Sequence, residues 1–321
     1  MSAKNELKLT EAEVLKRQKR RTRLKNNAFF FGLATPGIIA LLLFSYFPMA
    51  GLYMVFTKYT YQGGIFGSEF VGLQNFKFFF MNLDAALRAT KNTLVINLIS
   101  MAVGTCCNVG LAIVLNELGN KLYKSVTQSV MLFPHFVSWI VVGVVARGIL
   151  DTDMGLLNQL IVACGGEATN WYMSPEYWWF ILIFSNIWKG MGYGSIVYSC
   201  AITGLDPSLY EAAKVDGASR WKQIFYITIP QLKPTIVIML LLSMGGVLGG
   251  SVDQIMGLTN LNPMLFETTD TVATFVYRSA ILNGQFESAS AITLYQSIFG
   301  FLFVMLGNFI VKKIQPDYAL F

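Results

Sequence analysis

Residues 28–57 read AFFFGLATPGIIALLLFSYFPMAGLYMVFT, a run of 30 residues without one charged side chain. A helix needs about 20 predominantly apolar residues to cross the hydrocarbon core of a bilayer. The run follows the basic segment KRQKRRTR at residues 16–23. A cleaved signal peptide has the same order of charge and apolar residues, but its apolar core is only about 7–15 residues long. The run therefore predicts a first membrane-spanning helix.

Apolar runs of similar length recur along the rest of the chain. Of its 321 residues, 54% are hydrophobic and only 13% are charged, and this is about half the charged fraction of a soluble domain. The predicted fold is an all-α membrane protein with six transmembrane helices. The transmembrane domain covers residues 28–311, between a basic tail at 1–27 and a short tail at 312–321. The five later helices are expected at 93–115, 126–149, 178–202, 235–256 and 289–311.

The distribution of Lys and Arg predicts the orientation. With six helices, four polar segments would lie on one side of the membrane: 1–27, 121–124, 203–233 and 312–313. Together they hold 17 of the 24 basic residues. The loop at 151–177, on the other side, has four carboxylates and no Lys or Arg. Basic residues favour the cytoplasmic side, so both termini are expected in the cytoplasm, with the chain crossing the membrane repeatedly. Orientation also explains the net charge of +6, and no nucleic-acid partner is expected.

Several kinds of chemistry are not expected in this chain. Its four cysteines form no CxxC pair, and His135 is its one histidine, so a metal centre or a Ser-His-Asp triad is improbable. No GxxxxGK[ST] loop is present to hold a nucleotide phosphate. We expect no catalytic residue, no metal and no cofactor in this chain. If nucleotide energy is used, another chain supplies it.

One polar loop, at 203–232, carries the most specific pattern. Residues 206–230 read DPSLYEAAKVDGASRWKQIFYITIP. Asp206 is a natural N-cap and Pro207 a natural first helical residue, and Gly217 permits a left-handed stop. A short helix, a turn and a second, amphipathic helical segment at 219–229 are predicted. We expect Pro230 to end that segment before the fifth transmembrane helix.

The spacing within this loop resembles the coupling motif of type I ABC importer permeases, which are binding-protein-dependent. In that motif, Glu-Ala-Ala is separated by three residues from Gly, and nine more residues separate that Gly from Ile-x-Leu-Pro. This chain departs from it only in having Ile229 in place of Leu. The resemblance implies a cytoplasmic coupling helix between transmembrane helices four and five. The residues that match the motif are Glu211, Ala212, Ala213, Gly217, Ile227 and Pro230.

The resemblance also implies partners and a substrate class. It implies a second homologous permease, a cytoplasmic ATPase dimer that binds ATP and Mg²⁺, and an extracytoplasmic sugar-binding lipoprotein. Short stretches of the chain are similar to the branch that carries complex carbohydrates, which implies import of an oligosaccharide. A permease for a non-sugar solute remains an alternative, because the coupling motif is shared. The stretches are YFPM at 46–49, FVGLQNF at 70–76, FPHFVSW at 133–139, GGV at 245–247 and DQI at 253–255.

Two other classes of membrane protein are less consistent with the sequence. A self-contained secondary transporter would show internal repeats and coupled ionisable residues in several spans, and neither is convincing here. An enzyme acting on lipid-linked sugars would need a catalytic cluster at a membrane edge. Asp151 and Asp153 are the nearest candidates, and their loop has the ordinary acidity of an outer face.

Polar residues inside the predicted spans are candidates for a substrate pathway. Lys189 falls near the middle of helix four, where a charge is costly unless it faces a cavity or a partner. It is either a pathway residue or a packed structural lysine. His135 follows Pro134, a residue that frees a backbone carbonyl and favours a kink. The candidates are Lys189, His135, Trp188, Tyr193, Asp253 and Gln254, and for each of them packing within the bundle is the alternative.

Glycines in two spans allow close contact between helices. In helix four, Gly190, Gly192 and Gly194 permit either local unwinding or close packing. In helix five, the pairs Gly245/Gly249 and Gly246/Gly250 have the small-xxx-small spacing of helix contacts. Either a second permease or another helix of the same chain could lie against that face.

Overall fold

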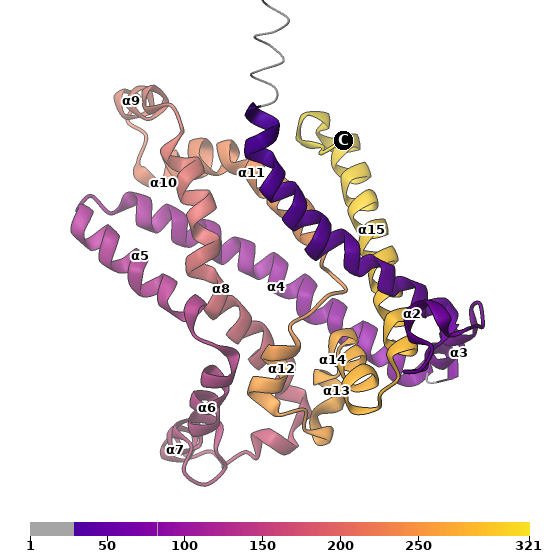
Figure 1. The fold of residues 1–321 in the computed structure, drawn as a ribbon. Coiled ribbons are helices and arrows are strands. Elements are labelled where there is room, and N and C mark those ends of the chain that lie inside the picture. The colour runs from indigo at the N-terminus through magenta and orange to yellow at the C-terminus, as the bar shows by residue number, and fades with distance from the viewer. Residues whose placement is uncertain (1–28, 82) are drawn as a thin grey trace, which may run out of the picture.

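The computed structural model describes residues 29–81 and 83–321, so the predicted basic tail at 1–27 lies outside the described residues. The described chain is mostly helical, and its one antiparallel strand pair consists of β1 (Thr57–Lys58) beside β2 (Glu69–Phe70). Figure 1 shows long helices running between two ends of the molecule. The start of the first helix, α9 and the C-terminus lie at one end, and α6, α7 and α13 lie at the other.

Long helices make up most of the structure. Four of them are long and apolar enough to cross a membrane: Phe29–Phe56, α4 (Leu83–Glu117), Arg220–Met244 and α15 (Phe286–Ile314). The pair of α5 (Lys121–Phe136) and α6 (Trp139–Leu150) passes the same test when taken together, which gives up to five spans. The helix α8 (Trp178–Thr203) is 26 residues long and completes the set of long helices.

Two of the long helices contain segments that are not α-helical. The first continues from residue 41 into a π-helix, Leu42–Tyr46, and a 3-10 helix, Phe47–Phe56. Arg220–Met244 consists of α10 (Arg220–Gln223), a π-helix (Ile224–Thr228) and α11 (Ile229–Met244). The shorter elements are α2 (Gly64–Gly67), α3 (Gln74–Met81), α7 (Leu156–Ala163), α9 (Pro207–Val215), α12 (Val252–Thr259), α13 (Phe266–Thr269), α14 (Val272–Tyr277), the π-helix Arg278–Leu282, and 3-10 turns at Trp171–Met173, Pro175–Tyr177, Pro263–Leu265 and Pro316–Tyr318.

The third predicted span is not one straight helix. The sequence predicts a helix over 126–149, whereas α5 and α6 meet at a bend of 96°. The backbone is extended at Val137 and Ser138, and the Ser138 hydroxyl caps α6 by accepting a hydrogen bond from the amide of Val141 at 3.4 Å. Pro134 lies three residues before the break. The helix is therefore fully interrupted after Phe136, where Pro134 predicted a kink.

The fifth predicted span is interrupted as well. The sequence predicts a helix over 235–256, whereas α11 ends at Met244 and α12 begins only after Ser251. The glycines at 245–250 lie in this non-helical segment, so the predicted small-xxx-small stripe on a helix is wrong. Asn97 donates to the carbonyl oxygens of Val247 and Gly249 at 2.8 and 2.9 Å, and so it bonds backbone groups that the break leaves free.

Glycines bring several helices into backbone contact. A Cβ atom on Gly192 of α8 would collide with the carbonyl oxygen of Met131 in α5. One on Gly143 of α6 would collide with the carbonyl oxygen of Gly257 in α12. Because α8 is a continuous helix around Gly192, the structure favours close packing over the alternative of local unwinding. The bundle therefore contains two tight seams, α5 against α8 and α6 against α12.

A buried ion pair joins elements at the end opposite α9. The Asp270 side chain is fully buried, and Arg278 donates to its two carboxylate oxygens at 2.7 and 3.0 Å. The Thr274 hydroxyl donates to the same carboxylate at 3.1 Å, and Arg88 of α4 lies 3.7 Å from it. A buried carboxylate needs such neutralisation. This cluster fixes the start of α4 against the segment that contains α14.

We predict that Gly143→Ala lowers the stability of the protein by about 1–3 kcal/mol, because the added methyl group forces α6 and α12 apart. Gly148 lies on the same helix and has open space around its Cα. The matched change Gly148→Ala should leave stability unchanged or raise it by up to about 1 kcal/mol. Thermal unfolding of the detergent-purified protein, followed by circular dichroism, measures both changes. Equal effects of the two substitutions would contradict the tight α6–α12 seam.

Candidate functional site

The loop between α8 and the helix Arg220–Met244 folds as a helical hairpin. The Asp206 carboxylate caps α9 by accepting a hydrogen bond from the amide of Ser208 at 2.9 Å. This backbone hydrogen bond is the main reason that the pKa of Asp206 is lowered. Gly217 has φ +74°, a backbone conformation that glycine adopts without steric cost. The predicted start of the helix and its glycine turn are confirmed.

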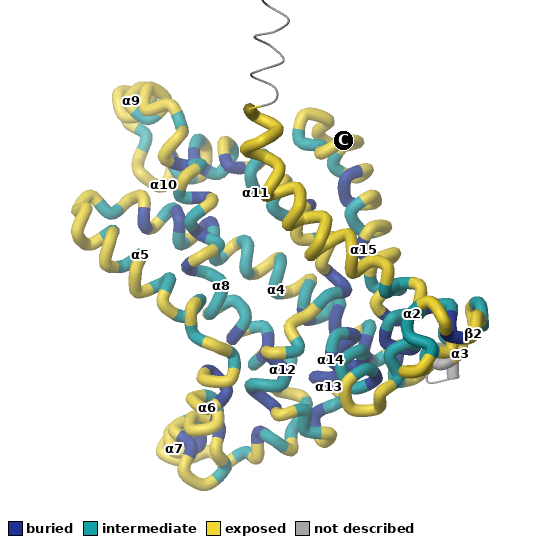
Figure 2. The backbone as a smooth tube through the Cα atoms, viewed as in Figure 1, coloured by how far each residue is buried: buried dark blue, intermediate teal, exposed yellow. Residues whose placement is uncertain are grey.

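The short helix α9 lies apart from the long helices, at one end of the molecule (Figure 2). Glu211 and Ala212 are exposed and Ala213 is half-buried. The base of the hairpin is held to the bundle by hydrogen bonds: Tyr210 and Thr228 join their hydroxyls at 3.0 Å, and Arg220 pairs with Glu117 of α4 at 3.1 Å. An exposed helix on such a fixed base can transmit rigid-body motion to the bundle.

The second half of the loop differs from the expectation. Pro230 does not end a helical segment, because Arg220–Met244 is one continuous helix. Pro230 lies in the first turn of α11, after the π-helix Ile224–Thr228. The wider π turn is the irregularity that accommodates the proline ring within the helix. Ile227 and Pro230 are both half-buried in this helix, so they lie on a different element from Glu211, Ala212 and Ala213.

Lys189 lies at the break between α5 and α6. Its ammonium group donates to the carbonyl oxygen of His135 at 2.6 Å and to that of Pro134 at 3.3 Å. It also lies 5.5 Å from the centre of the Trp139 ring, on the far side of the break. A cation at the carbonyl end of a helix is favourable electrostatically. Lys189 thus bonds the last carbonyls of α5 and contacts the first residue of α6.

The remaining predicted pathway residues have different surroundings. The His135 ring stacks on Tyr193 at 4.4 Å between ring centres. The Gln254 side chain is buried and donates to the carbonyl oxygen of Leu182 at 2.8 Å and to the hydroxyl of Ser185 at 3.2 Å. Gln254 therefore joins α12 to α8 inside the bundle. Trp188 is exposed on α8.

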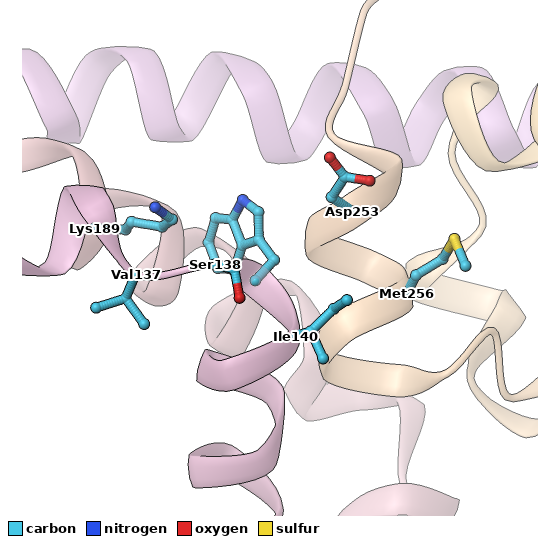
Figure 3. Close-up of a pocket in the computed structure, with 7 residues that line it drawn as sticks. Val137, Ser138, Ile140, Lys189, Asp253 and Met256 are labelled. Carbon is cyan, nitrogen blue, oxygen red and sulfur yellow. The ribbon is translucent and has the colours of Figure 1, made fainter.

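A cleft of about 390 Å³ lies beside the α5–α6 break. Figure 3 shows Lys189 and Asp253 approaching it from opposite sides. Of the six predicted pathway residues, this cleft brings together two, Lys189 and Asp253. The other four are not among the residues that line it. Its full lining consists of Val137, Ser138, Trp139, Ile140, Lys189, Asp253 and Met256.

A second cleft, of about 290 Å³, is lined mainly by polar residues of α4. We refer to it as the polar groove. It contains no charged residue, and amide and hydroxyl groups of α4 face α8 and the segment around residues 243–247 across it. The groove is lined by Asn97, Ser100, Met101, Gly104, Thr105, Asn108, Asn186, Ser243, Gly246 and Val247.

The groove is not among the sites predicted from the sequence, although a signal for it exists. Polar or small residues occur along α4 at positions 97, 100, 104, 105 and 108. At 3.6 residues per turn these five positions fall within an arc of about 140° on one side of the helix. A search for uninterrupted apolar runs treats this stripe as part of an ordinary span.

Two side-chain atoms at the groove are buried without a hydrogen-bond partner, the Ser100 hydroxyl and the Asn108 carbonyl oxygen. A buried polar atom without a hydrogen-bond partner is unfavourable. Among the residues that the structure describes, no group of three or more His, Cys, Asp or Glu side chains could hold a metal ion. The chemistry available at the groove is hydrogen bonding to the hydroxyl groups of a polar solute.

Comparison with known proteins gives one family match. Residues 100–318 match the family described as "Binding-protein-dependent transport system inner membrane component". The chain is also similar to the polygalacturonan/rhamnogalacturonan transport system permease protein YteP of Bacillus subtilis. The two are 36% identical over 310 residues, and the alignment covers 96% of each chain.

Two solved structures with the same fold are of bacterial alginate ABC transporters. A chain of a bacterial ABC transporter involved in the import of the acidic polysaccharide alginate superimposes with a TM-score of 0.80 at 31% identity. The match covers 92% of this chain and 99% of that chain. A chain of the alginate transporter in complex with its alginate pentasaccharide-bound periplasmic protein gives the same score and identity, over 91% of this chain and 97% of that chain.

We predict that Lys189→Met lowers the stability of the protein by about 1–3 kcal/mol, the usual value for hydrogen bonds to a charged group. Lys189→Arg keeps the charge and its donors and should lose less. Lys312→Met, at the exposed end of α15, serves as the control for removing a lysine charge. Thermal unfolding in detergent measures all three variants. Wild-type stability of Lys189→Met would show that Lys189 does not hold the break.

Proposed function

The chain belongs to the family of binding-protein-dependent transport system inner membrane components, and we propose that it is the permease subunit of an ATP-driven ABC importer that carries a carbohydrate into the cytoplasm. The observation that carries this proposal is the exposed hairpin at α9, with its left-handed turn at Gly217. The subunit itself changes no covalent bond. It works by alternating access, while ATP and Mg²⁺ are bound by a separate ATPase dimer.

We propose six spans with both termini in the cytoplasm. The sixth span is α8, whose 26 residues extend about 39 Å at 1.5 Å per residue, which is enough to cross a bilayer. Its polar residues, Asn186 and Lys189 among them, lower its mean hydropathy. The start of the first helix, the C-terminus and α9 lie at the same end of the molecule in Figure 1, which supports an even number of crossings.

The hairpin is proposed to dock on the ATPase. Glu211 offers a carboxylate to basic or hydroxyl groups, and the adjacent alanines let α9 lie close in a groove. Tyr210 links α9 to Thr228 of the helix Arg220–Met244, and Arg220 of that helix pairs with Glu117 of α4, so movement of α9 would reach Arg220–Met244 directly and α4 through it. Ile227 and Pro230 act in the base of the hairpin rather than in its docking surface.

A second homologous permease is the proposed partner within the membrane. The polar groove opens at the surface of this chain, where hydrocarbon could not satisfy its amide and hydroxyl groups. A second subunit lying over α4 would enclose the groove as a water-filled passage. The groove and the neighbouring cleft at Lys189 and Asp253 are the proposed substrate pathway.

An oligosaccharide is the proposed substrate. The polar groove offers amide and hydroxyl groups, which match the hydroxyls of a sugar, and two of its polar atoms lack partners within the chain. The similar proteins are named for the transport of polygalacturonan, rhamnogalacturonan and alginate. An extracytoplasmic sugar-binding lipoprotein would deliver the substrate, since one of the similar structures includes an oligosaccharide-bound periplasmic protein.

We predict that Glu211→Lys reduces uptake to background while the protein remains folded in the membrane. Glu211 is exposed and caps no helix, so its replacement changes the docking surface and leaves the bundle intact. Cells lacking the native gene are complemented with each variant and given labelled oligosaccharides from pectin and alginate, with a peptide as the non-sugar control. Membrane levels are measured by immunoblot.

The matched control is Glu167→Lys, which makes the same change at an exposed site in the loop at the opposite end. It should transport normally. If Glu211→Lys also transports normally, the coupling role of α9 is refuted. If only the peptide is taken up, the chain is still an importer permease, but a carbohydrate is not its substrate.

A second prediction concerns the polar groove. Because the Ser100 hydroxyl is buried without a partner in the isolated chain, Ser100→Ala should leave stability unchanged or raise it by about 1 kcal/mol. The same change should raise the KM for uptake several-fold, since the sugar loses a partner. Ser129→Ala on the exposed face of α5 should alter neither quantity. An unchanged KM for Ser100→Ala would remove Ser100 from the pathway.

A further inference from the structure

Aromatic and basic side chains share one exposed face of the helix Arg220–Met244, next to the hairpin. Trp221, Phe225 and Tyr226 are 71%, 58% and 80% exposed. The Trp221 and Phe225 rings stack with their centres 6.3 Å apart and their planes 24° from parallel. Lys222 and Lys233 are exposed on the same helix. We refer to these five residues as the basic-aromatic face.

The π-helix Ile224–Thr228 aligns this face. Lys233 lies twelve residues after Trp221, a spacing that would place the two about 120° apart in a regular α-helix. A single π turn takes up one extra residue. The segment then covers close to three turns, so Lys233 returns to within about 20° of Trp221. An irregularity of the helix therefore gathers the lysine and the aromatic rings on one side.

The other side of this helix is fixed to the protein. Gln223 is buried and donates to the carbonyl oxygen of Ala218 at 2.9 Å. Thr228 bonds Tyr210 of α9, and Leu232 is fully buried. The helix therefore cannot turn its aromatic residues inward without breaking these contacts. The basic-aromatic face has to meet something outside the chain.

The charge of the face is not neutralised within the part of the chain that the structure describes. Arg220 forms an ion pair with Glu117. The other ion pairs found among the described residues are those of Asp270 with Arg278 and Arg88, so neither Lys222 nor Lys233 pairs with a carboxylate. Two free ammonium groups beside exposed aromatic rings fit an anionic partner that also presents apolar surface.

We propose that the basic-aromatic face binds the headgroup of an anionic phospholipid in the membrane leaflet on the hairpin side. Aromatic rings favour the membrane interface, and lysines next to a span attract anionic headgroups there. The face lies on the helix Arg220–Met244, which is long and apolar enough to cross a membrane. The helix α9 projects away from that helix (Figure 1). Placing this leaflet on the cytoplasmic side rests on the proposed function, but the lipid contact itself does not.

The proposed lipid would hold the base of the hairpin. Thr228 follows Tyr226 by two residues and bonds Tyr210 of α9, so a headgroup that fixes the π turn also fixes the angle at which α9 projects. Loss of anionic lipid would then weaken coupling without changing the docking surface of α9. The face is thus a lipid site that sets the geometry of the coupling helix.

The test is quenching of Trp221 fluorescence by brominated lipids. The full-length chain, with whatever subunits remain bound, is reconstituted in phosphatidylcholine containing brominated phosphatidylglycerol or, separately, brominated phosphatidylcholine. Subtracting the signal of Trp221→Phe isolates the contribution of Trp221 from the other five tryptophans. The expected result is stronger quenching by phosphatidylglycerol, with a preference of about 5-fold for each lysine at low salt.

Two double variants distinguish a specific site from general attraction to the surface. Lys222→Ala with Lys233→Ala should remove the preference, whereas Lys312→Ala with Lys313→Ala, at the end of α15, should keep it. Equal quenching by both lipids in the wild type, or a preference that survives the first double variant, would overturn the proposal. So would the absence of any quenching, which would show that another protein covers the face. Quenching does not depend on transport, so it fails or succeeds separately from the importer assignment.

Discussion

The structure depends on one constraint, that backbone polar groups need hydrogen-bond partners wherever water is excluded. The breaks after Phe136 and Met244 leave carbonyl oxygens without helical partners, and side chains from other helices bond them. Lys189 of α8 donates a hydrogen bond to a carbonyl oxygen at the first break, and Asn97 of α4 donates to two carbonyl oxygens at the second. Gln296 of α15 adds a bond to the Leu248 carbonyl at 2.9 Å. Each such side chain therefore satisfies a carbonyl oxygen at a break and also connects two parts of the bundle.

Glycine contacts pack four of the helices into two units, and Gln254 of α12 joins one unit to the other through α8. The contact at Gly192 joins α5 to α8, and the contact at Gly143 joins α6 to α12. Between these two units lies the extended backbone at Val137 and Ser138, bonded from one side by Lys189. The hairpin connects to α4 through Arg220. Arg220 therefore links the base of the hairpin to the helix that carries the polar groove.

Much of the hairpin could be predicted from the sequence, because its signals are local. Asp206, Pro207 and Gly217 each act within one turn of backbone, and each has the predicted effect. The two broken spans could not be located in the same way, since apolar runs look alike whether or not they are interrupted. Their breaks depend on distant donors such as Asn97 and Lys189, which sequence spacing does not connect to residues 247 or 135.

The candidate pathway was only partly predictable for the same reason. Lys189, Asp253 and Gln254 were predicted because they are polar residues within apolar spans. Lys189 and Asp253 line one cleft, whereas Gln254 forms hydrogen bonds inside the bundle. The polar groove was missed because its residues are uncharged and are spread over three turns of α4. A helical-period search for polar residues within apolar spans would have found it.

The central claim, that this chain is one subunit of an importer powered by another protein, is tested most directly by what it binds. The tagged chain is purified from native membranes in mild detergent, and the bound proteins are identified by mass spectrometry. The account predicts recovery of a second multi-span permease and an ATPase, with the ATPase lost on Gly217→Val and retained on Gly165→Val, the same change at another left-handed glycine. Recovery of the chain alone, stable and monodisperse, would contradict it.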